Sequence, residues 1–203
     1  MTHEPQRAIF LDRDGTLIEE IGHLHRIQDI CVYPETYQAV RKINESEFLA
    51  IVVTNQSAIA RGFLTEKELE EIHLFIQDDF RQEEAWIDAF YYCPHHPEAG
   101  TESYTQECPC RKPKPGMLLQ AAEELNLALS PSHMIGDKLI DVEAGHRAGC
   151  QSVLIKSEHS TRMQQDLDEE KVSTSSHENS LQIPDHISSN VLGAVDWIME
   201  HNS

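Results

Sequence analysis

The sequence is short of positive charge, of aromatic side chains and of long apolar runs. Its 203 residues include 16 lysines and arginines against 35 aspartates and glutamates, a formal net charge of −19. Such a charge disfavours binding to nucleic acids or anionic lipid, and an aromatic content of 6% offers little surface for stacking single-stranded bases. No apolar run approaches the roughly 20 residues of a membrane helix, and residues 1–7 contain no hydrophobic signal core. We therefore expect a cytoplasmic protein that binds neither nucleic acid nor membrane.

Cysteine is also scarce, with five residues in the chain. In the reducing compartment expected here they are poor disulfide candidates, and we interpret them as thiols or metal ligands. Cys31 and Cys150 are expected to be packing residues, because buried free cysteine is common.

The other three cysteines stand near two histidines, in Cys93-Pro94-His95-His96 and Cys108-Pro109-Cys110. Two close ligand pairs separated by a loop are typical of a tetrahedral Zn²⁺ site, and four protein ligands indicate a structural rather than a catalytic ion. The predicted ligands are Cys93, His95, Cys108 and Cys110. His96 is the rival for the histidine position, and the alternative is a loop of unrelated residues. A zinc ion would pin the loop over residues 93–110 and place Arg111-Lys112, which follow it.

Short apolar runs alternate with helical patterns along most of the chain. The predicted strands are residues 8–11, 49–53, 89–92, 134–135 and 152–155. Five helices are expected. One ends near residue 48, one follows a capping box of Thr65 and Glu68, and one begins at Pro115-Gly116. The other two cover residues 142–148 and 191–199. Strands that are apolar throughout indicate a parallel sheet covered on both faces. We predict a single domain over residues 1–203 with an α/β fold, a Rossmann-like three-layer sandwich with a central parallel sheet and no large cap domain.

Three local expectations complete this prediction. In the helix that opens at Pro115-Gly116, Leu118, Leu119, Ala122 and Leu125 are expected to face inward. Residues 157–182 are polar and acidic and fit no regular pattern, so we interpret them as a long surface excursion. The remaining histidines, including His25, His73 and His146, are expected to be surface or core residues without a functional role.

The run Asp12-Arg13-Asp14-Gly15-Thr16 follows the first predicted strand directly. Two carboxylates one residue apart can reach one site if the loop curls, so that one attacks phosphorus while the other handles a proton. An ionised carboxylate is a competent nucleophile at neutral pH, and its product is an aspartyl-phosphate. The plainer interpretation is an acidic turn, since aspartate and glycine favour turns. Such a turn would need neither a buried strand before it nor partners elsewhere in the chain.

Candidate partners follow the other predicted strands, where ligands gather in parallel sheets. Thr54-Asn55 could hold phosphoryl oxygens, although alone it would be interpreted as a helix cap. Arg111-Lys112 offers cations at a rigid turn, and alone would be an ordinary basic loop. Gly136-Asp137 ends the fourth strand, with Asp141 one helical turn further on. The ligands predicted for Mg²⁺ are Asp12, Asp137 and a carbonyl of Asp14.

This ordered set resembles the haloacid dehalogenase superfamily of phosphatases, over about residues 7–156. The resemblance implies that Asp12 is the nucleophile and that Asp14 acts first as general acid and then as general base. It also implies that Thr54 and Lys112 bind the transferring phosphoryl group and that Asp137 holds magnesium.

Within that superfamily, residues 93–97 and 108–113 are similar to the zinc-containing D-glycero-D-manno-heptose 1,7-bisphosphate phosphatases, and the stretches 53–57, 59–62, 91–93 and 134–138 agree. The resemblance implies removal of the C7 phosphate during heptose precursor synthesis for the lipopolysaccharide of the bacterial envelope. The substrate-binding residues it implies are Glu20, His23, Thr54, Asn55, Gln56, Ser57, Arg111, Lys112 and Lys138. His23 stands where a tyrosine is usual, which leaves the sugar and anomer preference open.

Two other functions are weighed against this one. Histidinol-phosphate phosphatases share the zinc loop in a shorter form, and the longer loop here favours the heptose substrate. A zinc-stabilised binding protein without catalysis is the alternative of another class, and the intact Asp12, Asp14, Lys112 and Asp137 speak against it. We expect a monomer that acts on a small-molecule phosphorylated sugar.

Overall fold

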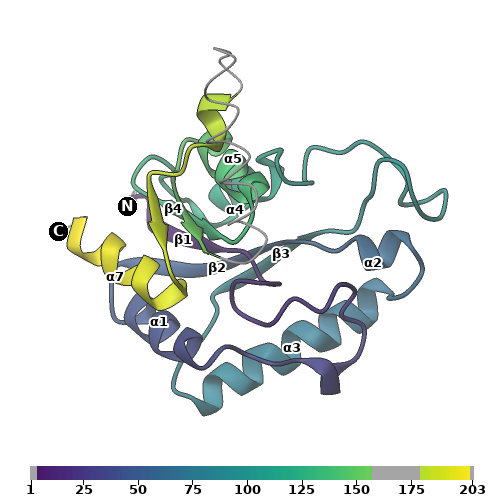
Figure 1. Ribbon diagram of the computed structural model, residues 1–203, viewed down its shortest axis with the longest axis horizontal. Helices are drawn as coiled ribbons and strands as arrows, with labels where there is room; N and C mark the ends of the chain where they lie inside the picture. Colours follow the sequence, from purple (N-terminus) through teal and green to yellow (C-terminus); the bar gives the residue numbers. More distant parts are fainter. Residues whose placement is uncertain (1–3, 157–178, 202–203) are drawn as a thin grey trace.

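A single parallel sheet organises the part of the chain that the computed structural model describes, residues 4–156 and 179–201 (Figure 1). Its strand order is β3-β2-β1-β4-β5-β6, and every neighbouring pair is parallel. The strands are β1 (Arg7–Leu11), β2 (Phe48–Asn55), β3 (Ala89–Cys93), β4 (His133–Gly136), β5 (Gln151–Ile155) and β6 (His186–Ser188). The helices are α1 (Pro34–Asn44), α2 (Ser57–Ala60), α3 (Glu66–Gln82), α4 (Gly116–Leu125), α5 (Leu139–Ala148) and α7 (Val191–His201).

Both faces of the sheet are covered, as the apolar strands predict. Because side chains alternate along a strand, Ile9 and Leu11 of β1 join the core beneath α1, α3 and α7, whereas Ala8 and Phe10 join the core beneath α4 and α5. Figure 1 shows these helices in two layers with the sheet between them. The predicted Rossmann-like three-layer sandwich is therefore confirmed.

The register of β1 fixes which strand ends meet. Leu11, its last residue, pairs with Val52 of β2 on one side and with Ile135 of β4 on the other. The chain therefore leaves β1, β2 and β4 along one edge of the sheet. Further out, Asn55 of β2 pairs with Cys93 of β3, which brings the loop after β3 to the same edge.

Local signals set the ends of two helices. The predicted capping box opens α3: Thr65 Oγ1 accepts from the Glu68 backbone at 3.2 Å, and Glu68 Oε2 accepts from the Thr65 backbone at 2.8 Å. Gly149 ends α5 with φ at +90°, a left-handed conformation that suits glycine. The residues between β1 and α1 contain a single 3₁₀ helix, η1 (Ile27–Asp29), so the expected absence of a large cap domain holds there.

Several expectations need correction. The sequence pattern missed β6, and Leu119 of α4 does not face inward but is 46% exposed. Cys31 is exposed rather than a packing residue, whereas Cys150 is buried as expected. The polar excursion predicted over 157–182 lies outside the described residues up to 178, and its end forms the 3₁₀ helix η2 (Asn179–Gln182). None of the helices within the described ranges has the length and hydropathy needed to cross a membrane.

Candidate active site

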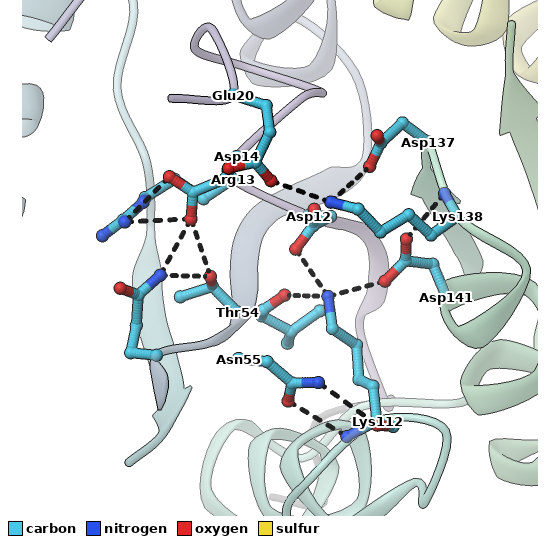
Figure 2. Close-up of polar contacts among 12 residues, drawn as sticks. Asp12, Arg13, Asp14, Glu20, Thr54, Asn55, Lys112, Asp137, Lys138 and Asp141 are labelled. Atoms are coloured by element: carbon cyan, nitrogen blue, oxygen red, sulfur yellow. Dashed lines mark hydrogen bonds and ion pairs between the residues drawn. The ribbon is translucent and has the colours of Figure 1, made fainter. Parts of the chain in front are cut away.

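Polar side chains from four segments meet beyond the carboxyl ends of β1, β2 and β4 (Figure 2). They line a cavity of about 70 Å³. Its walls include Asp12, Asp14, Thr54, Lys112, Lys138 and Asp141. Ligands of parallel sheets bind at this edge, so the fold brings the predicted residues to the expected place.

Asp12 is the first residue after β1, and its position is fixed from both sides. Its backbone amide donates to the Ile135 carbonyl of β4 at 2.9 Å, and its Oδ1 accepts from Lys112 Nζ at 2.6 Å. The side chain is buried. Burial raises the pKa of Asp12 to about 7, against the opposing effect of the Lys112 ammonium.

Lys112 reaches the site from the loop before α4. Its ammonium forms ion pairs with Asp12 at 2.6 Å and with Asp141 at 2.7 Å, and donates to the Val53 carbonyl at 2.8 Å. Asn55 clamps its backbone, accepting from the Lys112 amide at 3.1 Å and donating to its carbonyl at 3.2 Å. Burial lowers the pKa of Lys112, but the two carboxylates outweigh it and hold that pKa above its ordinary value.

Asp14 is held in its charged form. Arg13 Nη2 lies 2.9 Å from its carboxylate, Gln56 Nε2 donates to it at 2.8 Å, and Thr54 Oγ1 lies 3.4 Å away. Burial favours the neutral acid, yet the Arg13 guanidinium and the Gln56 amide lower the pKa of Asp14 below its ordinary value. Gln56 also donates to Thr54 at 2.8 Å, so these side chains form one network.

A second group of carboxylates surrounds Asp12. Oxygens of Asp12, Asp137 and Asp141 all lie within 4.8 Å of one another. Asp137 Oδ1 is buried and has no hydrogen bond from the described residues, and the Lys138 ammonium is 3.5 Å from it. Burial is the main cause that raises the pKa of Asp137 to about 6. Clustered carboxylates with an unsatisfied oxygen suit a hard divalent cation such as Mg²⁺.

Two glycines allow this close approach. A Cβ on Gly15, whose φ is +89°, would lie 2.5 Å from Asp137 Oδ2. A Cβ on Gly136 would lie 2.4 Å from the Asp141 Cβ.

The structure brings together two of the carboxylates predicted to bind magnesium, Asp12 and Asp137. Asp141 belongs to the same group, although it was not among the predicted ligands. The Asp14 side chain is not part of this group.

The cysteines and one histidine of the loop after β3 form a separate cluster. The sulfurs of Cys93, Cys108 and Cys110 are 3.0 to 3.4 Å apart, and His95 Nδ1 lies 3.8 and 3.5 Å from Cys93 and Cys110. Metal–sulfur bonds of about 2.3 Å place tetrahedral ligands about 3.8 Å apart, so the cluster could hold a metal ion. The hydrogen bond between the Cys110 and Cys93 sulfurs is the main cause that lowers the pKa of Cys110 to about 5. A lower pKa favours the thiolate, which is the form that binds metals.

The structure distinguishes the two histidines of this loop. His96 Nδ1 accepts from the backbone amides of Glu98 and Ala99 at 3.2 and 3.1 Å, which shapes the loop rather than the cluster. His95 is therefore the histidine of the cluster.

The sequence matches the haloacid dehalogenase-like hydrolase family over residues 19–149 and a HAD-hydrolase-like family over residues 109–191. The chain belongs to the haloacid dehalogenase-like hydrolase family. Several relatives carry the name D-glycero-beta-D-manno-heptose-1,7-bisphosphate 7-phosphatase, and two of them follow. The Escherichia coli K12 protein is 42% identical over 137 residues, 68% of this hydrolase and 72% of the relative. The Pasteurella multocida Pm70 protein is 42% identical over 153 residues, 75% and 83% of the two chains.

A solved structure of D,D-heptose 1,7-bisphosphate phosphatase from B. bronchiseptica, complexed with magnesium and phosphate, has the same fold as this hydrolase. The TM-score is 0.78 at 24% identity, and the match covers 96% of this chain and 98% of the other. The resemblance to the superfamily and to its heptose bisphosphate phosphatases is thus confirmed.

The other predicted substrate-binding residues of the hydrolase do not all line the cavity beside Asp12. Glu20, His23 and Ser57 line the cavity, and Glu20 Oε2 accepts from Lys138 Nζ at 3.0 Å. Arg111 lies apart: its Nη1 donates to the His95 carbonyl at 3.0 Å, and it lines a neighbouring cavity of about 290 Å³. Its role in substrate binding stays a prediction.

Sequence reasoning missed Arg13 and His73. No role was predicted for Arg13, yet its side chain is among the largest that are fully buried. His73 lies in α3, buried against Arg13. An arginine between the two carboxylates predicted to be catalytic was the available signal, because a cation beside Asp14 lowers the pKa of that carboxyl; nothing local marked His73.

Proposed function

We propose that this hydrolase is a magnesium-dependent phosphatase that removes the C7 phosphate of D-glycero-D-manno-heptose 1,7-bisphosphate. The observation that carries the proposal is 42% identity, over two thirds of the chain or more, to relatives that bear this name. The geometry around Asp12 supports the same chemistry, because a buried carboxylate, a buried ammonium and a cation site meet at one cavity.

In the first half-reaction a carboxylate oxygen of Asp12 attacks phosphorus, and the bond from phosphorus to the sugar oxygen breaks. The departing oxygen takes a proton from Asp14, which acts as general acid. Asp14 is ionised beside Arg13, but the negative charge of a bound phosphoryl group raises the pKa of a nearby carboxyl. Lys112 and Thr54 bind the phosphoryl oxygens and stabilise the charge that develops on them.

In the second half-reaction Asp14 removes a proton from water as the water oxygen attacks the phosphorus of aspartyl-phosphate. The bond between phosphorus and Asp12 breaks, which returns the Asp12 carboxylate and releases inorganic phosphate. The ionised Asp14 held by Arg13 and Gln56 is the base that this step needs.

Asp12 and Asp137, with Asp141 beside them and the Asp14 carbonyl as a further predicted ligand, would hold Mg²⁺. When bound, the ion neutralises carboxylate charge and polarises the phosphoryl group. The cluster of Cys93, His95, Cys108 and Cys110 would hold a structural Zn²⁺.

A panel of phosphate esters tests the substrate. The purified enzyme with Mg²⁺ is expected to release phosphate from both anomers of heptose 1,7-bisphosphate much faster than from histidinol phosphate. A preference for histidinol phosphate would overturn the heptose assignment.

Magnesium is expected to stabilise the protein far more at pH 7.5 than at pH 5. The raised pKa values of Asp12, about 7, and Asp137, about 6, mean that protons occupy both carboxyls at pH 5 and oppose the ion. The measurement is the rise in Tm on adding Mg²⁺ at each pH. Asp137→Asn is the control and should lose most of the rise at pH 7.5; an equal rise at both pH values in the wild type would contradict the assignment.

Replacing Cys108 by serine is expected to remove tightly held zinc and to lower Tm by about 10 °C. Activity should fall as well, because the cluster ends at Cys110 and Lys112 follows two residues later. Metal analysis of the purified protein measures the zinc. Cys150→Ser, which alters a buried thiol outside the cluster, should keep its zinc. Folded wild-type protein without zinc would contradict the assignment of this cluster as a zinc site.

A further inference from the structure

The Arg13 side chain points into the protein interior, although Arg13 lies between Asp12 and Asp14 in the loop after β1. Its side chain is only 1% exposed. Nη2 donates to the Asp14 carboxylate at 2.9 Å, and Nη1 lies 3.3 Å from His73 Nε2. The Nε of Arg13 has no hydrogen-bond partner among the described residues. A buried guanidinium requires acceptors, so these two contacts determine how Arg13 is oriented.

His73 is suited to be the second acceptor. It lies on the buried face of α3, and its ring stacks on Phe90 at a centroid distance of 4.6 Å and an interplanar angle of 20°. Arginine can only donate, so Nε2 of His73 must accept and the ring must be neutral. Burial, aided by the Arg13 charge, lowers the pKa of His73 to about 3, which keeps it neutral at physiological pH.

We propose that His73 is a positioning residue for phosphoryl transfer: its Nε2 orients the Arg13 guanidinium, and Arg13 in turn fixes the Asp14 carboxylate. The contacts run from α3 through Arg13 to Asp14, and Gln56 holds the same carboxylate at 2.8 Å. Without His73, Nη1 of Arg13 loses its acceptor, and the guanidinium is free to turn away from Asp14. This inference rests on the proposed function, in which Asp14 protonates the departing sugar oxygen.

The leaving group distinguishes positioning of Asp14 from a general structural role. An alkoxide leaving from a sugar phosphate needs a proton from Asp14, whereas p-nitrophenolate leaves readily without one. General acid catalysis contributes about 10² to 10⁴-fold. Asp14 also activates water in the second half-reaction, which both esters share, so the comparison uses kcat/KM, which reports the steps up to departure of the leaving group. A misplaced Asp14 should lower kcat/KM for the sugar ester much more than for the aryl ester, and a merely weakened fold should lower both alike.

The experiment compares kcat/KM for heptose 1,7-bisphosphate and for p-nitrophenyl phosphate in His73→Phe and His73→Gln. Phenylalanine keeps a ring on Phe90 without an acceptor, and glutamine can place an oxygen near the position of Nε2. In His73→Phe the ratio of sugar-ester to aryl-ester kcat/KM should fall about 10 to 100-fold. His73→Gln should restore the ratio to within about threefold, and Asp14→Asn should show the largest fall.

Equal loss on both esters in His73→Phe, or an unchanged ratio, would overturn the proposal. If the wild type hydrolyses p-nitrophenyl phosphate but not the heptose ester, the proposed substrate is wrong, and the ratio is measured with glycerol 1-phosphate, another primary alkyl ester. Should His73→Phe fail to fold, ¹⁵N NMR of the wild type decides. A neutral ring protonated at Nδ1 at pH 7 supports the proposal, and a cationic ring or a proton on Nε2 overturns it.

Discussion

Replacing Asp12 by asparagine is expected to lower kcat on phosphate esters on the order of 10⁴-fold or more, as for the loss of other enzyme nucleophiles. The amide cannot form the acyl-phosphate bond, although it keeps the shape of the side chain. The measurement is steady-state phosphate release, with mass spectrometry of quenched reactions to detect phosphate on the wild-type chain. Variant activity within tenfold of the wild type would exclude Asp12 as the nucleophile.

The same substitution should leave the metal-free protein at least as stable as the wild type. Lys112 keeps its ion pair with Asp141 at 2.7 Å, and the repulsion of Asp12 with Asp137 and Asp141 disappears. Because the pKa of Asp12 rises from 3.8 to about 7 on folding, the native wild type binds more protons than the unfolded chain between these values and loses stability as pH rises through them. The Tm of Asp12→Asn relative to wild type should thus increase from pH 5 to pH 7.5.

Replacing Lys112 by methionine should lower kcat about 10³-fold, the range seen when one charge-stabilising donor is lost. Methionine fills much of the space but leaves the carboxylates of Asp12 and Asp141 without their shared cation. Removing one partner of a buried ion pair costs roughly 3–5 kcal/mol, so metal-free Lys112→Met should also unfold at lower denaturant. The reaction kinetics and a denaturant titration without Mg²⁺ measure the two effects.

Lys114→Met is the matched control for that prediction. Lys114 lies two residues further along the same loop and is paired with Glu107 at the surface, so its loss should leave kcat unchanged. A Lys112→Met enzyme within tenfold of the wild-type kcat would show that this ammonium is not needed for phosphoryl transfer.

The sequence predicted those parts of the fold in which the apolar residues of one strand are enough to indicate that the strand is buried. Residues 8–11 of β1 and 49–53 of β2 are apolar throughout, and each run is followed by polar residues at the end of the strand. β6 could not be predicted in this way, because its three residues are polar or partly exposed and it forms only by pairing with β5. Leu119 was assigned to the wrong face because a short helix leaves the helical phase poorly fixed.

The site was predictable to the extent that motifs lie beside the strand ends. Asp12, Thr54, Lys112 and Asp137 meet as expected, but the contacts that tune them cross long stretches of sequence. Arg13 and His73 are 60 residues apart, and no periodicity links a residue of α3 to a loop after β1. The adjacent His95 and His96 could not be told apart by spacing, since the distinction depends on how the loop folds.

The residues around the cavity differ in how strongly the fold constrains them. Asp12 and Lys112 are buried and bonded to the sheet or to one another, and Asp137 is buried beside them. Glu20 and His23 are exposed, and the His23 ring packs against the exposed Phe63 at a centroid distance of 5.3 Å. Substitution of the first group is expected to impair the reaction itself, whereas substitution of the second is expected to change which substrates enter the cavity. Substrate choice is therefore expected to change through positions 20 and 23 while the chemistry of phosphoryl transfer stays the same.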